Sequence, residues 1–522
     1  MAVTDTTLPE PVAAGASVAD STRSTPGELE VLVGTADHTT LGRLYIGFAL
    51  CALVAALVVR VLVGIDLVAD NGIFGSSLTM VDQSSAVALL FMGVAPALLG
   101  LAMVIVPLQV GAPSIAFARA ASLSLWTWLV SAVIFIVSIA IDGGLGGGDY
   151  DASVLGNLSF AAMMAAIALG SICVATTVLT HRPAGMTLAR VPLFAWSMLV
   201  AASVWILTIG AALAHSLMGQ VANDSAGGLA ENFTDGLSWL LRGPAVYMVA
   251  IPLLGIAGDA VARTTGRRLR NYGMFQALIA LFGVLSFGAW AQGPESLNTF
   301  VWALWALGAA LPVLGLLGGL AETLRYGSPK ASPALLGSFL GLLALLGAIL
   351  VGVLMALDTA GKGTLFDFEP AALGGAQSAF VVTAALAALL VGLVVWSPQL
   401  WGSPAPTSSA NGAAVLVFVG GVVFSVALAV WIFLIANDVD GDQALGVFQA
   451  TGALLMGMGL LGAIAAAFNS SRTAREGASD RDAGGMTLEW QVPWPAIAAE
   501  RTAELPESVD SPYPLADDSQ EG

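Results

Sequence analysis

Long uninterrupted runs of apolar residues dominate this chain and limit what it can fold into. From Leu41 to about Asn469 these runs recur, and each is long enough to cross a hydrocarbon layer roughly 30 Å thick. A lone strand in such a layer leaves its backbone N–H and C=O groups unsatisfied, so each run is predicted to be an α-helix. With 57% hydrophobic and 10% charged residues among 522, the composition excludes a soluble enzyme and predicts an all-α, polytopic membrane protein.

The apolar runs predict a domain of twelve transmembrane helices between residues 36 and 470. Residues 1–35 are rich in Ala, Ser, Thr, Pro and Glu, and we expect a disordered cytoplasmic tail without a cleavable signal peptide. Residues 471–522 return to a polar composition and are predicted to be a cytoplasmic C-terminal tail. The predicted spans are 41–67, 85–111, 122–141, 158–180, 191–217, 236–262, 274–293, 297–324, 335–357, 378–402, 413–436 and 444–470.

The charged residues between the predicted spans alternate in sign along the chain. Every second loop is basic, and the loops between them are acidic apart from Lys362. Because basic loops stay in the cytoplasm, both termini are predicted to be cytoplasmic, in a cell membrane of the prokaryotic inner-membrane type. The basic loops contain Arg119, Arg182, Arg190, Arg263, Arg267, Arg268, Arg270, Arg325 and Lys330, and the acidic loops contain Asp70, Asp82, Asp142, Asp149, Asp151, Asp224, Glu231, Glu295, Asp358, Asp367, Asp438, Asp440 and Asp442.

The overall charge restricts the possible partners. A net charge of −17 argues against nucleic acid and against a polybasic surface for lipid headgroups, although the lipid bilayer itself surrounds the helices. The acidic outer loops have two interpretations: a surface that attracts a cationic partner, or ordinary solvated loops, which we favour. Cys51 and Cys173 lie within apolar runs, so the sequence predicts neither a disulfide framework nor a cysteine metal site.

Several short segments are informative through their order along the chain, although each is weak alone. They are Asp37-His38, Leu41-Gly42-Arg43-Leu44-Tyr45, Val106-Pro107-Leu108, Gly111-Ala112-Pro113, Gly156-Asn157-Leu158, Pro192-Leu193-Phe194-Ala195-Trp196-Ser197, Gly243-Pro244-Ala245-Val246-Tyr247, Trp290-Ala291 and Thr487-Leu488-Glu489-Trp490. Taken together, from about Thr35 to Pro514, the series resembles subunit I of the haem-copper oxidases, the catalytic subunit of cytochrome c oxidase. The resemblance implies the twelve-helix fold of that subunit and other respiratory-complex subunits as partners.

The resemblance also implies cofactors that this chain is poorly equipped to hold. Members of the family bind two haems and a copper ion through six histidines, because neutral imidazole suits both metals. This chain has three histidines in total, so the complete set is absent. We therefore predict no cofactor and no metal, with the haem and copper of the family as the alternative. The residues expected at the ligand positions are Ser85 and Ser378 for the low-spin haem, Ala376 for the high-spin haem, and Gly243, Gln292 and Gly293 for copper.

Other positions of the family site are partly changed and partly retained. The proton-relaying glutamate aligns with Ala245, and the lysine of the proton channel aligns with Leu316. Arg60, Tyr247 and Trp290 match neighbours of the haem and copper site. Their retention indicates either an altered cofactor site or aromatic packing and a helix-end anchor inherited with the fold. We favour the second interpretation, because the ligands themselves decide metal binding.

Three further polar residues, Arg60, His215 and Arg242, are predicted to lie in the outer halves of helices. Charges inside a membrane are costly, so each needs a partner or water. The group indicates either an anion or quinone-headgroup site, or charge pairing at the outer interface, which we favour. His38 and His181 are expected to be surface or capping residues. The outer carboxylates available for pairing are Asp66, Asp82 and Asp235.

Three functions remain open at this point. The leading hypothesis is a pseudoenzyme, a cytochrome c oxidase subunit I-like protein without catalytic residues that serves a respiratory complex as a structural or regulatory component. The second is a terminal oxidase that passes electrons from cytochrome c or quinol to oxygen, with cofactors held by other ligands such as His215. The third is a transporter or small-molecule-binding protein that uses the vacated cavity. The polar residues available for the third are Ser85, Gln292, Gln377 and Ser378.

Overall fold

Helices make up the regular structure of the part of the chain that is described. The computed structural model describes residues 33–69, 72–223, 225–229, 231, 244–290, 304, 307–327, 329, 331–360, 370–435, 441–473, 485–493 and 508–516, and no strand occurs among them. The chain divides into two units, Met1–Thr35 and Ala36–Gly522. Every helix discussed below belongs to the second unit.

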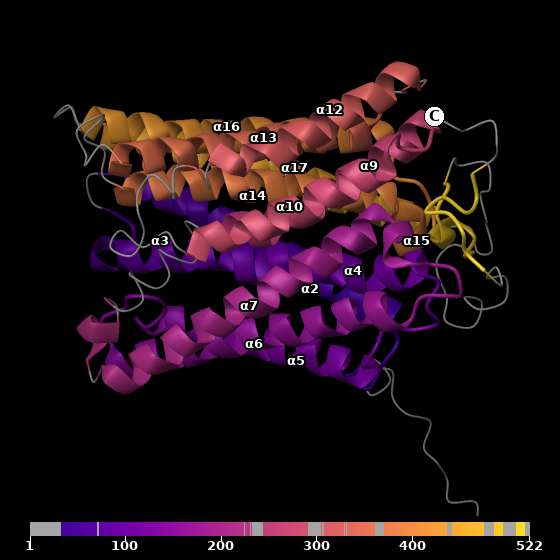
Figure 1. Cartoon of the computed structure of the whole chain (residues 1–522). Helices are drawn as coiled ribbons and strands as arrows, with labels where there is room; N and C mark the ends of the chain where they lie inside the picture. Colours follow the sequence, from indigo (N-terminus) through magenta and orange to yellow (C-terminus); the bar gives the residue numbers. More distant parts are fainter. Residues whose placement is uncertain are drawn as a thin grey trace, which may run out of the picture. The chain divides into compact units, whose positions relative to one another are not determined.

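Ten of the described helices are long and apolar enough to cross a membrane. One of them is the continuous run Gly75–Gln109, which joins α3, η2 and α4. The predicted seventh and eighth spans correspond to the shorter helices α10 and α12, so ten spans are shown and a count of twelve stays a prediction. The main helices (Figure 1) are α2 His38–Asp66, α3 Leu78–Val87, η2 Ala88–Val94, α4 Ala95–Gln109, α5 Ala118–Ala140, α6 Tyr150–Thr180, α7 Leu193–Ala222, α9 Pro244–Thr265, α10 Tyr272–Trp290, α12 Ala310–Tyr326, α13 Pro333–Ala360, α14 Pro370–Val395, α15 Ser397–Trp401, α16 Thr407–Ile435 and α17 Asp442–Arg472.

Local sequence signals set the starts of two helices. Asp37 caps α2, because its carboxylate accepts a hydrogen bond from the backbone N–H of Thr40 at 2.9 Å. Asp149 caps α6 in the same way through the N–H of Ala152 at 2.8 Å. Helix α2 begins at His38 and α6 at Tyr150, before the predicted apolar runs at 41 and 158, since hydropathy does not register a polar capping residue and polar initial turns.

The Gly75–Gln109 run lies at the centre of the bundle. All residues in the most apolar part of this run are buried, whereas only 39% of the corresponding residues of α2 are buried. It contacts α2, α5, α6, α7 and α14, and its middle turn, η2, is a wider π-type turn. Ser85 lies near one end of this run and Gln109 lies at the other. One buried helix therefore reaches two separate polar regions.

Glycines allow several helices to approach closely, as the small-residue content predicts for a membrane bundle. A Cβ atom added at Gly446 of α17 would lie 2.5 Å from the carbonyl oxygen of Gly64 in α2. A Cβ atom added at Gly42 of α2 would lie 2.5 Å from the carbonyl oxygen of Gly100 in α4. Helix α2 thus contacts α4 and α17 through backbone surfaces that have no room for a methyl group.

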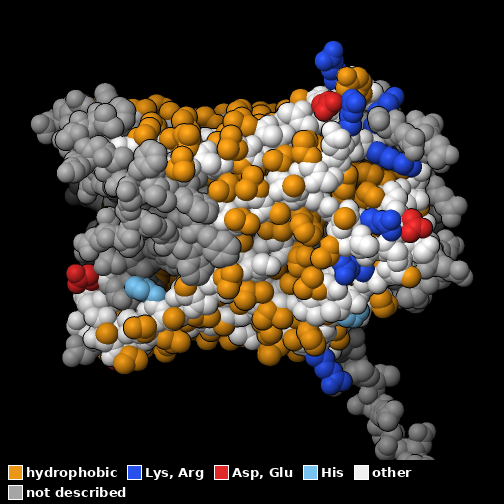
Figure 2. Space-filling view, in the orientation of Figure 1, with side chains coloured by type: hydrophobic (Ala, Val, Ile, Leu, Met, Phe, Trp, Pro, Cys, Tyr) orange, Lys and Arg blue, Asp and Glu red, His pale blue; other side chains and the backbone are white. Residues whose placement is uncertain are grey.

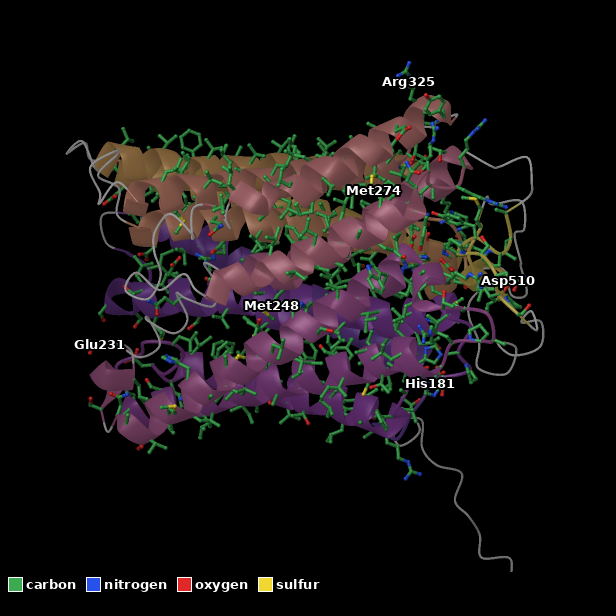
Figure 3. All side chains as sticks on the ribbon, in the orientation of Figure 1. His181, Glu231, Met248, Met274, Arg325 and Asp510 are labelled. Carbon is green, nitrogen blue, oxygen red and sulfur yellow. The ribbon has the colours of Figure 1, made fainter. Side chains whose placement is uncertain are left out.

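Basic side chains gather at one end of the helices (Figure 2). This is the end at which α6, α9 and α12 finish, and we call it the basic end. Figure 3 places His181, Arg325 and Asp510 there and Glu231 at the opposite end. The described residues of the predicted basic loops therefore lie at one end of the bundle.

Two segments of the C-terminal region pack against the basic end. Val509 donates its N–H to the carbonyl of Ala184 at 2.9 Å, and Leu515 donates to Met486 at 3.1 Å. The polar tail predicted from composition thus contains an ordered, partly apolar portion, which its scattered apolar residues did not reveal. We call residues 485–493 the C-terminal clamp, and its buried members include Met486, Leu488, Glu489, Trp490 and Val492.

Candidate functional site

The two serines predicted at the low-spin haem positions bond to their own helices. Ser85 is buried in α3, and its hydroxyl donates to the carbonyl of Asp82 at 2.9 Å. Ser378 of α14 is half-buried, and its hydroxyl donates to the carbonyl of Gly374 at 2.8 Å. Such local bonds are common for serines inside helices. A serine hydroxyl bonded in this way lacks the imidazole nitrogen through which a histidine binds haem iron.

The neighbouring positions on α14 are also packed. Ala376 is fully buried in an apolar cluster with Val351, Met355 and Leu373. Gln377 donates from its side chain to the carbonyl of Ala348 on α13 at 3.3 Å. Gln377 therefore connects two helices, and Ala376 offers a methyl group at the position where the resemblance implies a histidine for the high-spin haem.

Close packing also occupies the region about two turns beyond Ser85. A Cβ atom added at Gly93 would lie 2.3 Å from the Leu53 side chain, which is itself fully buried. Trp128 donates its indole N–H to the carbonyl of Phe91 at 3.0 Å. Among the described residues, no group of three or more His, Cys, Asp or Glu side chains is arranged to hold a metal ion. The donors described at the predicted positions do not fit haem ligation.

Several predicted site residues lie beyond what the structure describes. Arg242, Gly243, Gln292 and Gly293 lie outside the described residues, as does Asp235. The backbones of two retained neighbours belong to α9 and α10, but their side chains lie outside the described part; these are Tyr247 and Trp290.

Arg60 forms an ion pair at the end of the bundle opposite the basic end. Its guanidinium contacts the carboxylate of Asp82, and the two side chains are 11% and 47% exposed. The carboxylate of Asp66 instead accepts the N–H of Phe74 at 2.7 Å. His215 is exposed on α7, which packs mainly against α6 and α9. The geometry of Arg60 matches the charge-pairing interpretation.

The remaining two histidines differ from each other. His38 is 1% exposed, and its Nδ1 lies 2.8 Å from the carbonyl oxygen of Met103 in α4. The expectation of a surface or capping role is wrong for His38, because Asp37 provides the cap and the ring packs between helices. His181 is exposed at the C-terminus of α6, where its ring bonds to the hydroxyl of Thr180 at 2.8 Å. The expectation holds for His181.

A buried polar cluster at the basic end was not predicted from the sequence. Gln109, fully buried at the end of α4, donates from its side-chain nitrogen to Asp259 Oδ2 at 3.0 Å and to Glu489 Oε1 at 3.1 Å. Its side-chain oxygen accepts the N–H of Ala195 at 3.0 Å. One amide therefore joins the carboxyl groups of α9 and the C-terminal clamp to the start of α7. We call Gln109, Asp259 and Glu489 the carboxyl cluster.

Each carboxyl group of the cluster has further donors. Asp259 Oδ2 accepts the N–H of Phe194 at 3.0 Å, in the first turn of α7, where a negative group is favoured by the helix dipole. Glu489 Oε1 accepts the indole N–H of Trp396 at 3.2 Å. The Gln399 side chain donates to the backbone carbonyl of Glu489 at 2.5 Å. Burial raises the pKa of Glu489 above its ordinary value, and hydrogen bonds from Gln109 and Trp396 oppose that rise.

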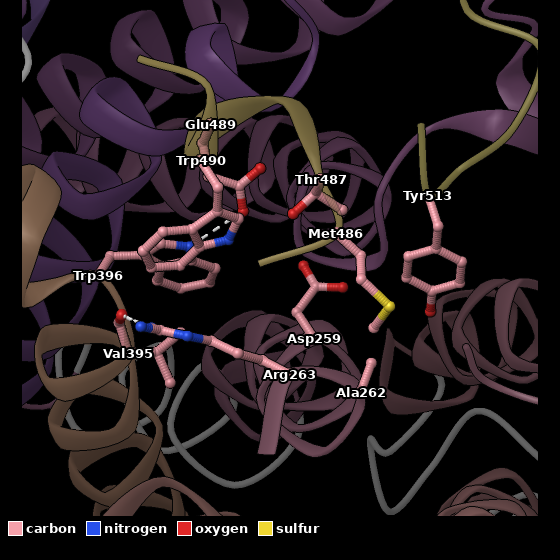
Figure 4. Close-up of a pocket in the computed structure, with 10 residues that line it drawn as sticks. All are labelled: Asp259, Ala262, Arg263, Val395, Trp396, Met486, Thr487, Glu489, Trp490 and Tyr513. Carbon is pink, nitrogen blue, oxygen red and sulfur yellow. Dashed lines mark hydrogen bonds between the residues drawn. The ribbon is translucent and has the colours of Figure 1, made fainter. Parts of the chain in front are cut away.

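A small cavity of about 10 Å³ lies beside the cluster, and Figure 4 shows the carboxyl groups of Asp259 and Glu489 among the groups that line it. Glu489 and Tyr513 are both buried, at 1% and 4% exposure. Arg263 stacks its guanidinium over the Trp490 ring, 3.8 Å from the ring centroid, and donates to the carbonyl of Val395. The cavity is lined by Asp259, Ala262, Arg263, Val395, Trp396, Met486, Thr487, Glu489, Trp490 and Tyr513.

One sequence signal for this cluster was available. Asp259 lies inside a predicted span, and a carboxylate within a span is rare enough to indicate a function or a partner. The segment Thr487 to Trp490 was noted only because it resembles the family. Nothing local in the sequence indicates that Gln109, 380 residues before Glu489, contacts it.

Comparison with known proteins identifies the family. A family model described as Cytochrome C and Quinol oxidase polypeptide I matches residues 40–437. The chain belongs to this family. Membership agrees with the resemblance drawn from the short ordered segments. It also establishes a multi-pass membrane protein that resembles subunit I of the haem-copper oxidases.

Two bacterial members of the family are similar over most of this chain. Quinol oxidase subunit 1 of Bacillus subtilis is 24% identical over 500 residues, covering 88% of this chain and 76% of that protein. The putative cytochrome c oxidase subunit 1-beta of Streptomyces avermitilis is 27% identical over 529 residues, covering 90% and 89%. Both relatives are named as subunits.

A solved structure shares the fold. A cryo-EM structure of a heme-copper terminal oxidase dimer superposes with a TM-score of 0.64, covering 89% of this chain and 86% of that chain at 13% identity. The helices of this chain therefore share the fold of that oxidase chain. Activity does not follow from a shared fold.

Proposed function

We propose that this chain is a non-catalytic member of the Cytochrome C and Quinol oxidase polypeptide I family that serves a respiratory membrane complex as a structural or regulatory subunit. The observation that carries the proposal is the histidine count. The chain has three histidines, whereas the family site implied by the resemblance requires six. The shortage of histidines supports the proposal, because the type of ligand governs which metal binds.

The positions of the three histidines support the proposal. His38 is buried against the carbonyl of Met103, His181 ends α6, and His215 is exposed on α7. They lie on three separate helices. Ser85, Ala376 and Ser378, at the predicted haem positions, supply hydroxyl and methyl groups that are bonded or packed locally.

The relatives support a role within an assembly. Both are named as subunit 1 of an oxidase, so partner subunits are expected for this chain as well. We further propose a bacterial-type cell membrane, with the basic end and both termini in the cytoplasm. The arginines at the basic end support that orientation, because basic residues favour the cytoplasmic side.

The proposal is tested by measuring cofactors on the intact protein. We would purify the full chain from its native membrane in mild detergent, then record a reduced-minus-oxidised visible spectrum and the iron and copper content of the same sample. The Bacillus subtilis relative, prepared in parallel, is the control for cofactor retention. We expect no haem bands and no stoichiometric iron or copper, with co-purifying subunits identified by mass spectrometry.

Two results would overturn the proposal. Stoichiometric haem in the purified chain would show that other ligands replace the family set, and changing His215→Ala would then test one of them. Oxygen reduction that depends on the bound haem would show that the chain is catalytic.

A further inference from the structure

We propose that Arg270, Tyr326 and Arg325 form a binding site for the headgroup of an anionic phospholipid, at the membrane surface on the basic end. We call these three residues the headgroup site. The exposed apolar faces of α10 and α12 beside it hold the acyl chains. The inference goes beyond the proposed function, because it depends on the surface of the bundle and is independent of whether the chain binds haem.

Three helix ends fix the position of the headgroup site. Helix α9 ends at Thr265, α10 begins at Tyr272, and α12 ends at Tyr326. A Cβ atom added at Gly327 would lie 2.8 Å from the Cβ atom of Thr265, so the end of α12 packs closely against the end of α9. The short connection between α9 and α10, which contains Arg270, therefore lies beside the last turn of α12.

Two arginines share one aromatic ring at this point. The guanidinium carbon of Arg270 lies 5.5 Å from the centroid of the Tyr326 ring, and that of Arg325 lies 5.9 Å from the same centroid. The two cations are therefore no more than 11.4 Å apart, the sum of the two distances. Like charges this close repel each other, and an anion bound between them relieves the repulsion. Arginine suits a phosphate group, because its planar guanidinium donates two parallel hydrogen bonds.

The charge of the headgroup site favours an anion. Arg270 donates to Oε1 of Glu322 at 3.2 Å, and both side chains are half-exposed. Arg325 is exposed and pairs with no carboxylate within the described part of the chain, and Figure 3 shows it projecting outward from the end of α12. Two cations and one carboxylate leave one net positive charge, which matches the single negative charge of a phosphodiester.

The apolar surface beside the headgroup site distinguishes a lipid from a soluble anion. Leu311 and Leu314 of α12 are more than half exposed. Met274 and Leu281 of α10 are exposed as well. A Cβ atom added at Gly318, one turn closer to the site than Leu314, would lie in open space with no contact within 4 Å. A phospholipid uses both features, since its chains cover apolar side chains and its phosphate meets arginine at the membrane surface.

A second ion pair at the basic end provides a matched control. Arg190 Nη1 lies 3.2 Å from Asp510 Oδ1, the same distance as in the pair of Arg270 and Glu322. Within the described residues, Arg190 stacks on no aromatic ring. Comparison of the two pairs therefore separates a specific headgroup site from the general attraction between arginines and anionic lipid.

Native mass spectrometry of the full chain in mild detergent measures the binding. Dioleoyl phosphatidylglycerol is the anionic probe, and dioleoyl phosphatidylcholine is the zwitterionic comparison. We expect the anionic lipid to bind more tightly, and Arg270→Gln or Arg325→Gln to weaken it by about five-fold, because each removes one cation from the phosphate. Glu322→Gln should instead tighten binding, since it releases Arg270 from its carboxylate. Arg190→Gln and Asp510→Asn should leave the affinity unchanged.

The opposite sign expected for Glu322→Gln keeps the test valid if an arginine variant folds poorly, because a misfolded chain does not bind lipid more tightly. Equal affinity for the two lipids, or equal effects at the control pair and at the headgroup site, would overturn the proposal.

Two further results would assign the site to another ligand. Displacement of the lipid by glycerol 3-phosphate at the same concentration would show that a soluble phosphate suffices. Loss of a co-purifying protein from the Arg270→Gln and Arg325→Gln double variant, with phosphatidylglycerol binding unchanged, would show a protein interface. Either result would overturn the proposal. None of these measurements depends on haem, so the proposed function stands or falls separately.

Discussion

Replacing Gln109 by leucine tests how much the carboxyl cluster contributes to folding. The substitution nearly conserves side-chain volume, so it removes hydrogen bonds without opening a large cavity. The Gln109 side chain donates to Asp259 and Glu489 at 3.0 and 3.1 Å and accepts from the N–H of Ala195 at 3.0 Å. With leucine at position 109, Asp259, Glu489 and the N–H of Ala195 each lose one hydrogen bond in a buried site.

The magnitude follows from those three bonds. A hydrogen bond to a charged group contributes about 1.5–3 kcal/mol, and a buried unsatisfied N–H costs about 1–3 kcal/mol. The bonds share one side chain, so their effects do not add fully. We expect Gln109→Leu to lower the free energy of unfolding by about 3–5 kcal/mol, the range found when a buried charged network loses one member.

Gln276→Leu is the matched control. Gln276 is also buried near the basic end, but its side chain donates to the neutral carbonyls of Leu188 and Val191, at 3.1 and 3.3 Å. Its loss should cost only about 1–2 kcal/mol. Both variants would be unfolded by SDS in mixed micelles and followed by far-ultraviolet circular dichroism. Equal losses in the two variants would refute the reasoning that charge makes the Gln109 bonds stronger.

Three further predictions concern packing, charge and cofactors. Gly446→Ala should destabilise the bundle by about 1–3 kcal/mol through overpacking against Gly64, whereas Gly457→Ala, whose Cβ would lie 3.9 Å from Leu57, should be neutral or stabilising in thermal unfolding. Asp82→Asn should cost about 1 kcal/mol or less, with a smaller effect at high salt, because Asp82 is half exposed; a salt-independent loss would contradict a surface ion pair. Dialysis against a strong metal chelator should leave the melting temperature unchanged, and a fall would indicate a structural metal.

Much of the transmembrane framework was predictable from the sequence. The first predicted span, 41–67, corresponds to α2 at His38–Asp66, and the last, 444–470, corresponds to α17 at Asp442–Arg472. Both predictions succeed because the hydrocarbon layer requires about 20 apolar residues in a row, which is a local property. The eighth predicted span, 297–324, ends close to the end of α12 at Tyr326, and most of the first part of that run lies outside the described residues.

The polar sites were predictable only where the partners are close in the chain. Arg60 and Asp82 are 22 residues apart in adjoining elements, and Asp82 was among the three carboxylates expected nearby. Gln109 and Asp259 are 150 residues apart, and their contact needs α4 and α9 to end at the same level. Hydropathy gives the length of an apolar run. It gives neither the position of the helix along the bundle axis nor the identity of its neighbours, so it cannot predict this contact.

The sequence by itself determined the class of protein and the helical framework, since these depend on composition and run length. It also excluded a complete set of six histidine ligands, because the chain has only three histidines. The tertiary structure alone decided that Gln109 bridges Asp259 and Glu489, that His38 is buried, and that part of the polar C-terminal region packs as a clamp. Each of these depends on the packing of helices distant in sequence. Burial and hydrogen-bond partners are properties of that packing, so they appear only when the helices are assembled.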